Sequence, residues 1–165
     1  MIGRLFGIIR DKEPPFLLID VNGVGYEVET SLTTQLQCPE LGQPISLYTH
    51  FVVREDAQLL YGFYDEIERR LFRSLIKVNG VGPKLAISIL SNIEPRDFVA
   101  YVKAQDSARL TQVPGIGKKT AERLIIEMRD RLKDWTIEGE KSPQGLSNSS
   151  DAVQDAIAAL IALGY

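Results

Sequence analysis

VNGVGPK, residues 78–84, decides the fold of the middle of the chain, because its pattern returns as VPGIGKK at residues 113–119. The surrounding segments, LFRSLIKVNGVGPKLAISIL (71–90) and DSARLTQVPGIGKKTAERLI (106–125), align with a constant offset of 35 residues. Each copy reads as a helix, a turn in which apolar residues and glycines alternate, and a second helix that opens with lysine. The sequence therefore predicts two helical hairpins of one kind in tandem.

The turns have the chemistry of a phosphate site. Glycines permit positive φ, and without a side chain they let backbone amides come close to a ligand. The first amides of the next helix have no intrahelical partner and lie at the positive end of the helix dipole, and lysine adds charge. We expect a phosphodiester as ligand, bound by Gly80, Gly82, Lys84, Gly115, Gly117, Lys118, Lys119, Thr120 and Arg123.

Other glycine motifs fit less well. A mononucleotide P-loop needs glycine where Gln112 stands and a strand before the turn, whereas a helix is predicted there. A dinucleotide-binding G-x-G-x-x-G lacks its third glycine at Leu85 and at Thr120, and no βαβ unit surrounds it. Two glycine turns without a ligand remain the alternative. Two copies with lysine at the helix start favour contact with the DNA backbone.

The charge distribution supports a polyanionic ligand. The whole chain of 165 residues has a formal net charge of −3, which by itself argues against nucleic acid. Residues 69–133, however, hold 14 Lys and Arg against 6 Asp and Glu, whereas residues 1–64 hold 4 against 8. The positive excess coincides with the repeat, so this is the region where a polyanion is expected to bind.

The first 64 residues predict β-structure. Five β-branched or aromatic runs are separated by turn signals such as KEPP and NGVG: MIGRLFGII, FLLIDV, GYEVET, ISLYTHFVV and QLLYGFY. Five strands in this length favour a small closed barrel of the oligonucleotide-binding type, with an SH3-like barrel as the alternative. A short helix is expected after Ser31.

The period becomes helical at Asp65, which with Glu68 has the spacing of a capping box. The last helix of this second region is predicted over Lys118 to Lys133, with Ala121, Leu124, Ile125, Met128 and Leu132 on one face. SPQGLSNSS (142–150) has the composition of a flexible linker, and residues 151–165 predict an amphipathic helix that needs packing partners.

The expected fold class is therefore α+β with several domains. An N-terminal five-stranded barrel of the oligonucleotide-binding type covers residues 1–64, and an all-α tandem of helical hairpins covers residues 65–141. A flexible linker (142–150) and a truncated helical C-terminal domain (151–165) follow.

Glu55 and Asp56 fall at the predicted tip of a β-hairpin, HFVVREDAQLLYGF (50–63). A metal site is disfavoured because adjacent turn residues offer two carboxylates and no third ligand is near in sequence. A catalytic pair is disfavoured further, and a solvated turn is the ordinary interpretation of such a dipeptide. Beside a DNA-binding region, carboxylates that repel phosphates are a further alternative.

The composition sets outer limits. Cys38 and His50 are the single cysteine and histidine, so neither a disulfide within the chain nor a thiol or imidazole metal cluster is expected, and no cofactor is predicted. No apolar run approaches the roughly 18 residues of a membrane span, and the N-terminus lacks the pattern of a signal peptide. A soluble cytoplasmic protein without a membrane partner is expected.

The paired turns resemble the tandem helix-hairpin-helix motif, which grips duplex phosphates across the minor groove without reading base sequence. With the N-terminal MIGRL, the acidic hairpin, VNGVGPK, VPGIGKKTAERL, the linker and the terminal ALGY, all 165 residues resemble the RuvA family of bacterial proteins that recognise Holliday junctions. The resemblance implies a homotetramer on four-way junction DNA, with Glu55 and Asp56 as an acidic pin near its centre.

The resemblance also implies partners. These are a RuvB-type ATPase motor, engaged through a three-helix C-terminal domain, and a RuvC-type resolvase, on the bacterial nucleoid. Only the first helix of that domain is recognisable here, so coupling to the motor is expected to be impaired. A helix-hairpin-helix glycosylase or nuclease is the alternative. Such glycosylases place a catalytic aspartate in a loop, whereas Asp130 and Asp134 fall within or at the end of a predicted helix, which favours a scaffold without catalysis.

Overall fold

The computed structural model describes residues 1–133 and 135, and residues 1–135 form one compact unit. The predicted linker at 142–150 and the predicted helix at 151–165 lie outside the described residues. None of the described helices is long and apolar enough to cross a membrane.

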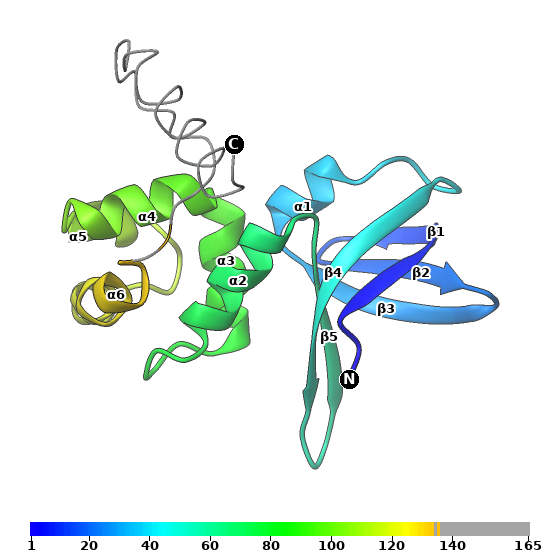
Figure 1. The fold of residues 1–165 in the computed structure, drawn as a ribbon, viewed down its shortest axis with the longest axis horizontal. Helices are drawn as coiled ribbons and strands as arrows, with labels where there is room; N and C mark the ends of the chain where they lie inside the picture. The colour runs from blue at the N-terminus through cyan, green and yellow to red at the C-terminus, as the bar shows by residue number, and fades with distance from the viewer. Residues whose placement is uncertain (134, 136–165) are drawn as a thin grey trace, which may run out of the picture. The chain divides into compact units, whose positions relative to one another are not determined.

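Five strands close into a barrel in the order β1-β2-β3-β5-β4 (Figure 1). They are β1 (Arg4–Glu13), β2 (Phe16–Val21), β3 (Val24–Thr30), β4 (Pro44–Val53) and β5 (Gln58–Phe63). Only β3 and β5 pair in parallel, and helix α1 (Leu32–Gln37) stands between β3 and β4 along the chain, where a short helix was expected. The predicted five-stranded barrel is confirmed, and its order fits a Greek-key barrel of the oligonucleotide-binding type.

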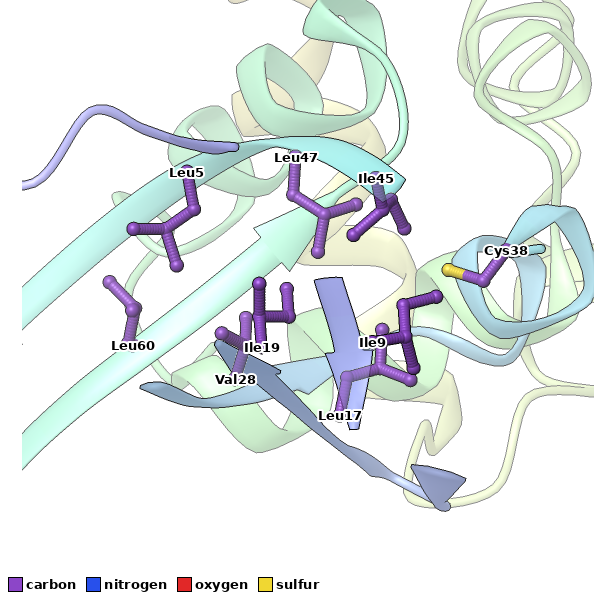
Figure 2. Packing of buried hydrophobic residues seen from close by; sticks show 9 residues of the cluster. All are labelled: Leu5, Ile9, Leu17, Ile19, Val28, Cys38, Ile45, Leu47 and Leu60. Carbon is purple, nitrogen blue, oxygen red and sulfur yellow. The ribbon is translucent and has the colours of Figure 1, made fainter. Parts of the chain in front are cut away.

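The barrel core follows from the alternation of apolar and polar residues along the strands, which sends every second side chain inward. Figure 2 shows the buried side chains that meet there, contributed by all five strands and by the end of α1. They are Leu5, Ile9, Leu17, Ile19, Val28, Cys38, Ile45, Leu47 and Leu60. Burial raises the pKa of the Cys38 thiol to about 11, so this cysteine is a core residue.

The pentapeptide Val-Asn-Gly-Val-Gly occurs twice, at residues 21–25 and 78–82, in two different structures. In the first it closes the β2–β3 hairpin, where Asn22 (φ 53°) and Gly23 (φ 90°) form the two-residue turn between the paired Val21 and Val24. In the second it lies between two helices. The neighbouring sequence therefore decides which structure these five residues take.

Within the described residues, five helices follow the barrel: α2 (Glu66–Leu75), α3 (Pro83–Asn92), α4 (Pro95–Lys103), α5 (Ser107–Leu110) and α6 (Lys118–Arg131). The predicted apolar face of α6 is buried in full, from Ala121 to Leu132, although the helix ends at Arg131 rather than at Lys133. The two helical hairpins predicted from the sequence are thus present as α2-turn-α3 and α5-turn-α6.

A buried carboxylate joins α2 to the barrel. Asp65 caps α2 by accepting from the Glu68 amide at 2.8 Å, as the capping spacing predicts. The Glu68 side chain, 2% exposed, instead accepts hydrogen bonds from the hydroxyls of Ser31 and of Thr34 (2.7 Å), at the start of α1. Burial raises the pKa of Glu68, which the two hydroxyls partly oppose.

Two further contacts fix α1 against α3. The Leu32 amide donates to Ser91 Oγ at 2.9 Å, and Thr33 Oγ1 donates to the Leu90 carbonyl at 2.8 Å. The single histidine, His50, lies beside α2, where its Nδ1 accepts from Arg73 Nε at 3.2 Å. Burial lowers the pKa of His50, with help from Arg73 and Arg69. These contacts hold the helical hairpins against the barrel.

Candidate nucleic-acid interface

The two glycine turns have the same backbone structure. Gly80 has φ 86° and Gly115 has φ 89°, the left-handed region that favours glycine. The Val81 amide donates to the Val78 carbonyl at 3.0 Å, and Ile116 donates to Val113 at 3.1 Å. All four of these apolar residues are buried. The offset of 35 residues in the sequence is therefore an offset between two equivalent structures.

The second glycine of each turn is the N-cap of a helix. Gly82 (φ −89°, ψ 173°) precedes α3, and Gly117 (φ −86°, ψ 173°) precedes α6. Their backbone angles are open to any residue, and a Cβ at either position would meet nothing within 4 Å. Neither cap gives its helix a side-chain hydrogen bond. The fold itself does not require glycine at either position. A ligand that approached the first amides of the helix would be helped by the absence of a side chain there.

The predicted lysines surround these helix starts. Lys84, Lys118 and Lys119 are exposed, and Thr120 is half-buried in the first turn of α6. Within the part of the chain that the structure describes, none of the three lysines forms a salt bridge. Their ammonium groups are therefore available to an external anion.

The two turns exchange hydrogen bonds with each other's helices. Ser88 Oγ on α3 donates to the Pro114 carbonyl in the second turn, and Arg123 Nη1 on α6 donates to the Asn79 carbonyl in the first, both at 3.3 Å. Ser88 and Arg123 are 35 residues apart, as are Asn79 and Pro114. The pair of hairpins is thus related by a local two-fold symmetry that the repeat had not revealed.

Each of the two first glycines also packs against the other hairpin, but through residues that do not correspond in the repeat. A Cβ at Gly80 would lie 3.4 Å from Arg123 Nη1, and one at Gly115 would lie 3.4 Å from Leu85 Cδ1. Arg123, predicted as a phosphate ligand, is exposed and also bridges the two turns. Sequence reasoning missed Ser88, although its alignment with Arg123 in the repeat was a usable signal.

The acidic pair lies apart from the turns. β4 and β5 stay paired up to Val53 and Gln58, and the Arg54 amide donates to the Ala57 carbonyl at 2.8 Å to close the tip. Glu55 and Asp56 are exposed there, at the end of a hairpin that projects from the barrel (Figure 1). Among the described residues, no group of three or more His, Cys, Asp and Glu side chains could hold a metal ion.

Two aspartates were considered for catalysis, and the structure describes Asp130. This residue is exposed and paired with Lys133 at 2.9 Å and with Arg129 at 4.0 Å. The hydrogen bond from Lys133 lowers the pKa of Asp130. Asp134 lies outside the described residues. An exposed, ionised and ion-paired carboxylate on a helix lacks the environment of a general base.

Comparisons with known proteins agree with this geometry. The family model described as RuvA N terminal domain matches residues 1–62, and that of a SAM-like helix-hairpin-helix tandem matches residues 72–130. A protein of Coxiella burnetii (strain CbuG_Q212) is 57% identical over all of this chain and 83% of its own length. A protein of Pseudomonas syringae pv. syringae (strain B728a) is 52% identical over all of this chain and 85% of its own. Both are called Holliday junction branch migration complex subunit RuvA.

Proposed function

The chain belongs to the RuvA family of Holliday junction branch migration complex subunits, and on this premise we propose that it binds four-way DNA junctions without reading base sequence. The protein holds the junction open as a subunit of a branch migration complex in recombination and repair. Its ligand is the phosphate backbone along the minor groove.

The observation that carries this proposal is the symmetric pair of turns. Each turn presents a helix start without a side-chain cap and with an exposed lysine, and the two are fixed to each other by the Ser88 and Arg123 hydrogen bonds. A duplex has two phosphate strands related by local two-fold symmetry, so paired sites of one kind suit it. Contacts to phosphates orient a protein on DNA but carry no base sequence.

The residues proposed to touch phosphate are those of the sequence analysis: Gly80, Gly82, Lys84, Gly115, Gly117, Lys118, Lys119, Thr120 and Arg123. Glu55 and Asp56 are proposed to act as an acidic pin. Their carboxylates repel phosphates, so a continuous duplex across the tip is disfavoured relative to a crossover where strands diverge.

The proposed assembly is a homotetramer, because four DNA arms are matched most simply by four copies of one subunit. The ATPase activity of branch migration belongs to a RuvB-type motor engaged through the C-terminal domain, and a RuvC-type resolvase is a further partner. The subunit itself acts as a scaffold without catalysis or cofactor. With such a DNA partner, the proposed location is the bacterial cytoplasm, on the nucleoid.

A salt titration tests the assignment. Replacing Lys84→Ala and Lys119→Ala together should weaken junction binding at every base sequence. Each lost phosphate contact should also reduce the slope of log K against log salt by about 0.9. The control Lys103→Ala with Lys133→Ala removes the same charge from exposed lysines outside the turns. If the two double variants had equal slopes, the site would be wrong, and cleavage of nicked, damaged or four-way DNA by the wild type would argue for the enzyme class.

A further inference from the structure

We propose that Asn79, in the first helix-hairpin-helix turn, is a site of spontaneous deamidation, while Asn22, inside an identical Val-Asn-Gly-Val-Gly pentapeptide, is protected by its surroundings. An asparagine before glycine is prone to this reaction because glycine has no Cβ to hinder attack by its own backbone nitrogen. Both asparagines are exposed and have the same neighbours in sequence. The glycine that follows dominates the rate in an unfolded chain, so the two rates should be similar there, although Asp20 and Lys77 stand at corresponding positions two residues earlier. A large difference between the rates would therefore come from the folded structure.

The reaction needs no cofactor. A base in the solvent, such as hydroxide, removes the proton from the Gly80 backbone nitrogen, which then attacks Cγ of the Asn79 side chain. The new N–Cγ bond closes a succinimide ring, the Cγ–Nδ2 bond breaks, and the nitrogen leaves as ammonia. Water then opens the ring at either carbonyl, which leaves aspartate or isoaspartate at position 79. No electron is transferred, and the slow step depends on how readily the backbone nitrogen loses its proton and reaches Cγ.

The backbone nitrogen that would attack is hydrogen-bonded at Gly23 and not at Gly80. The Gly23 amide donates to Asp20 Oδ1 at 2.8 Å, so its proton is held by a carboxylate. Among residues 1–133 and 135, no acceptor is paired with the Gly80 amide, and the Asn79 side chain makes no hydrogen bond either. Attack by Gly23 must break a charge-assisted hydrogen bond first, whereas attack by Gly80 breaks none.

The local charges act in the same direction. Loss of the Gly80 proton spreads negative charge onto the Asn79 carbonyl oxygen, which belongs to the same peptide bond. Arg123 Nη1 donates to that oxygen at 3.3 Å, so the guanidinium stabilises the anion. At the other site the Gly23 nitrogen lies 2.8 Å from Asp20 Oδ1, while Asp20 Oδ2 is paired with Arg10 at 3.0 Å, and a carboxylate in direct contact with the nitrogen destabilises an anion there. Arg123 therefore promotes the reaction at Asn79, and Asp20 suppresses it at Asn22.

Deamidation at position 79 would alter the candidate interface. It places a carboxylate in the turn, and isoaspartate also lengthens the backbone beside Gly80, whose φ of 86° defines the turn. This consequence rests on the proposed function, whereas the deamidation itself does not. If the turn faces phosphate, the aged protein should bind junctions less tightly.

The rates can be measured at both sites in one sample. The full chain is incubated at mildly alkaline pH and digested with trypsin, which separates the two pentapeptides into residues 78–84 and 13–54. Deamidated peptides gain about 1 Da, and isoaspartate is labelled by an isoaspartyl methyltransferase. In the folded protein Asn79 should react at least about tenfold faster than Asn22, and in urea the rates should converge. Equal rates in the folded protein, or the same ratio in urea, would overturn the proposal.

Two variants test the cause. Arg123→Gln should slow the reaction at Asn79 and leave Asn22 unchanged, whereas Asp20→Ala should accelerate Asn22 and leave Asn79 unchanged. Urea unfolding of each variant verifies that it is folded before the rates are compared. An unchanged rate at the targeted asparagine in either variant would overturn the assigned mechanism.

The effect on DNA is measured separately. Asn79→Asp introduces the charge, and Asn79→Ser is the neutral control. At low salt the first should bind a four-way junction about fivefold less tightly than the second, the effect of one unit charge near a phosphate in water. Equal affinities would argue that this turn does not contact DNA and would count against the proposed function. The two deamidation rates would be untouched by that result.

Discussion

Gly82 and Gly117 have ordinary backbone angles and open space where a Cβ would lie, yet both begin a helix without a side-chain cap. Serine at an N-cap accepts a hydrogen bond from the first turn of the helix and is preferred there over glycine. The same hydroxyl would occupy an amide that a phosphate needs. Stability and DNA affinity should therefore respond in opposite directions to serine at these residues.

We expect Gly82→Ser with Gly117→Ser to keep or raise the free energy of unfolding, by up to a few tenths of a kcal/mol per site, while weakening junction binding. Urea unfolding and DNA titration measure the two effects. Gly80→Ser is the contrasting control. Its φ of 86° strains any side chain, so it should lose roughly 1–2 kcal/mol of stability. Retained affinity in the double serine variant would show that no phosphate reaches these helix starts.

At the scale of elements, the joint between α1 and α2 depends on a carboxylate whose pKa is raised by burial. A raised pKa means that the folded state holds this proton more tightly than the unfolded chain does. The contribution of Glu68 to stability is therefore largest at acid pH and is lost as the pH rises through its folded pKa. Glu68→Gln removes this titration while keeping the shape of the side chain.

The stability of Glu68→Gln relative to wild type should accordingly rise between pH 4.5 and pH 7. Urea unfolding of both proteins at the two pH values gives the difference, in which the other titrating groups cancel. A relative stability that stays constant or falls with pH would mean that Glu68 is not held as a buried acid in the folded state.

The β4–β5 hairpin carries its two carboxylates away from the barrel, on a tip closed by one backbone hydrogen bond. Glu55→Gln with Asp56→Asn keeps the size of the side chains and removes two charges per subunit. Duplex affinity should rise, and junction affinity should rise less, so the ratio of junction to duplex affinity falls. The change should shrink at high salt because screening weakens the repulsion in the wild type.

Titration of both DNAs at two salt concentrations measures this ratio. Glu13→Gln with Glu40→Gln removes the same charge from exposed residues elsewhere in the barrel region, and it should leave the ratio unchanged. If the ratio of junction to duplex affinity changed equally in both double variants, the acidic tip would be an ordinary solvated turn without a role in selection. Sensitivity of the wild type to chelators would indicate a metal instead.

At the scale of the whole molecule, the proposed tetramer predicts a mass four times that of the 18.4 kDa chain. Native mass spectrometry or light scattering at micromolar protein, with and without a synthetic four-way junction, measures it. A monomer under both conditions would exclude the tetramer. The paired turns would then be expected to bind duplex DNA as a single chain.

The sequence predicted the features that require a particular residue type at a particular position. Positive φ requires glycine at Gly80 and Gly115, and a buried helix face requires apolar residues at a period near 3.6, so the turns and the face of α6 were visible. The buried position of Glu68 was not predicted, because a glutamate at this spacing can either cap the helix or pack inside the protein, and the sequence is the same in both cases. The Ser88 and Arg123 contacts were missed because two dissimilar side chains make equivalent bonds.

The reciprocal hydrogen bonds between the turns have a consequence for avidity. They link the two proposed phosphate sites through direct contacts, so once one site is occupied the other would meet its phosphate at a high effective concentration. The affinities of the two sites then multiply, provided that the span matches the separation of the two strands. Loosening that span at Ser88, which is not among the proposed phosphate ligands, would lower affinity even with every one of those ligands in place.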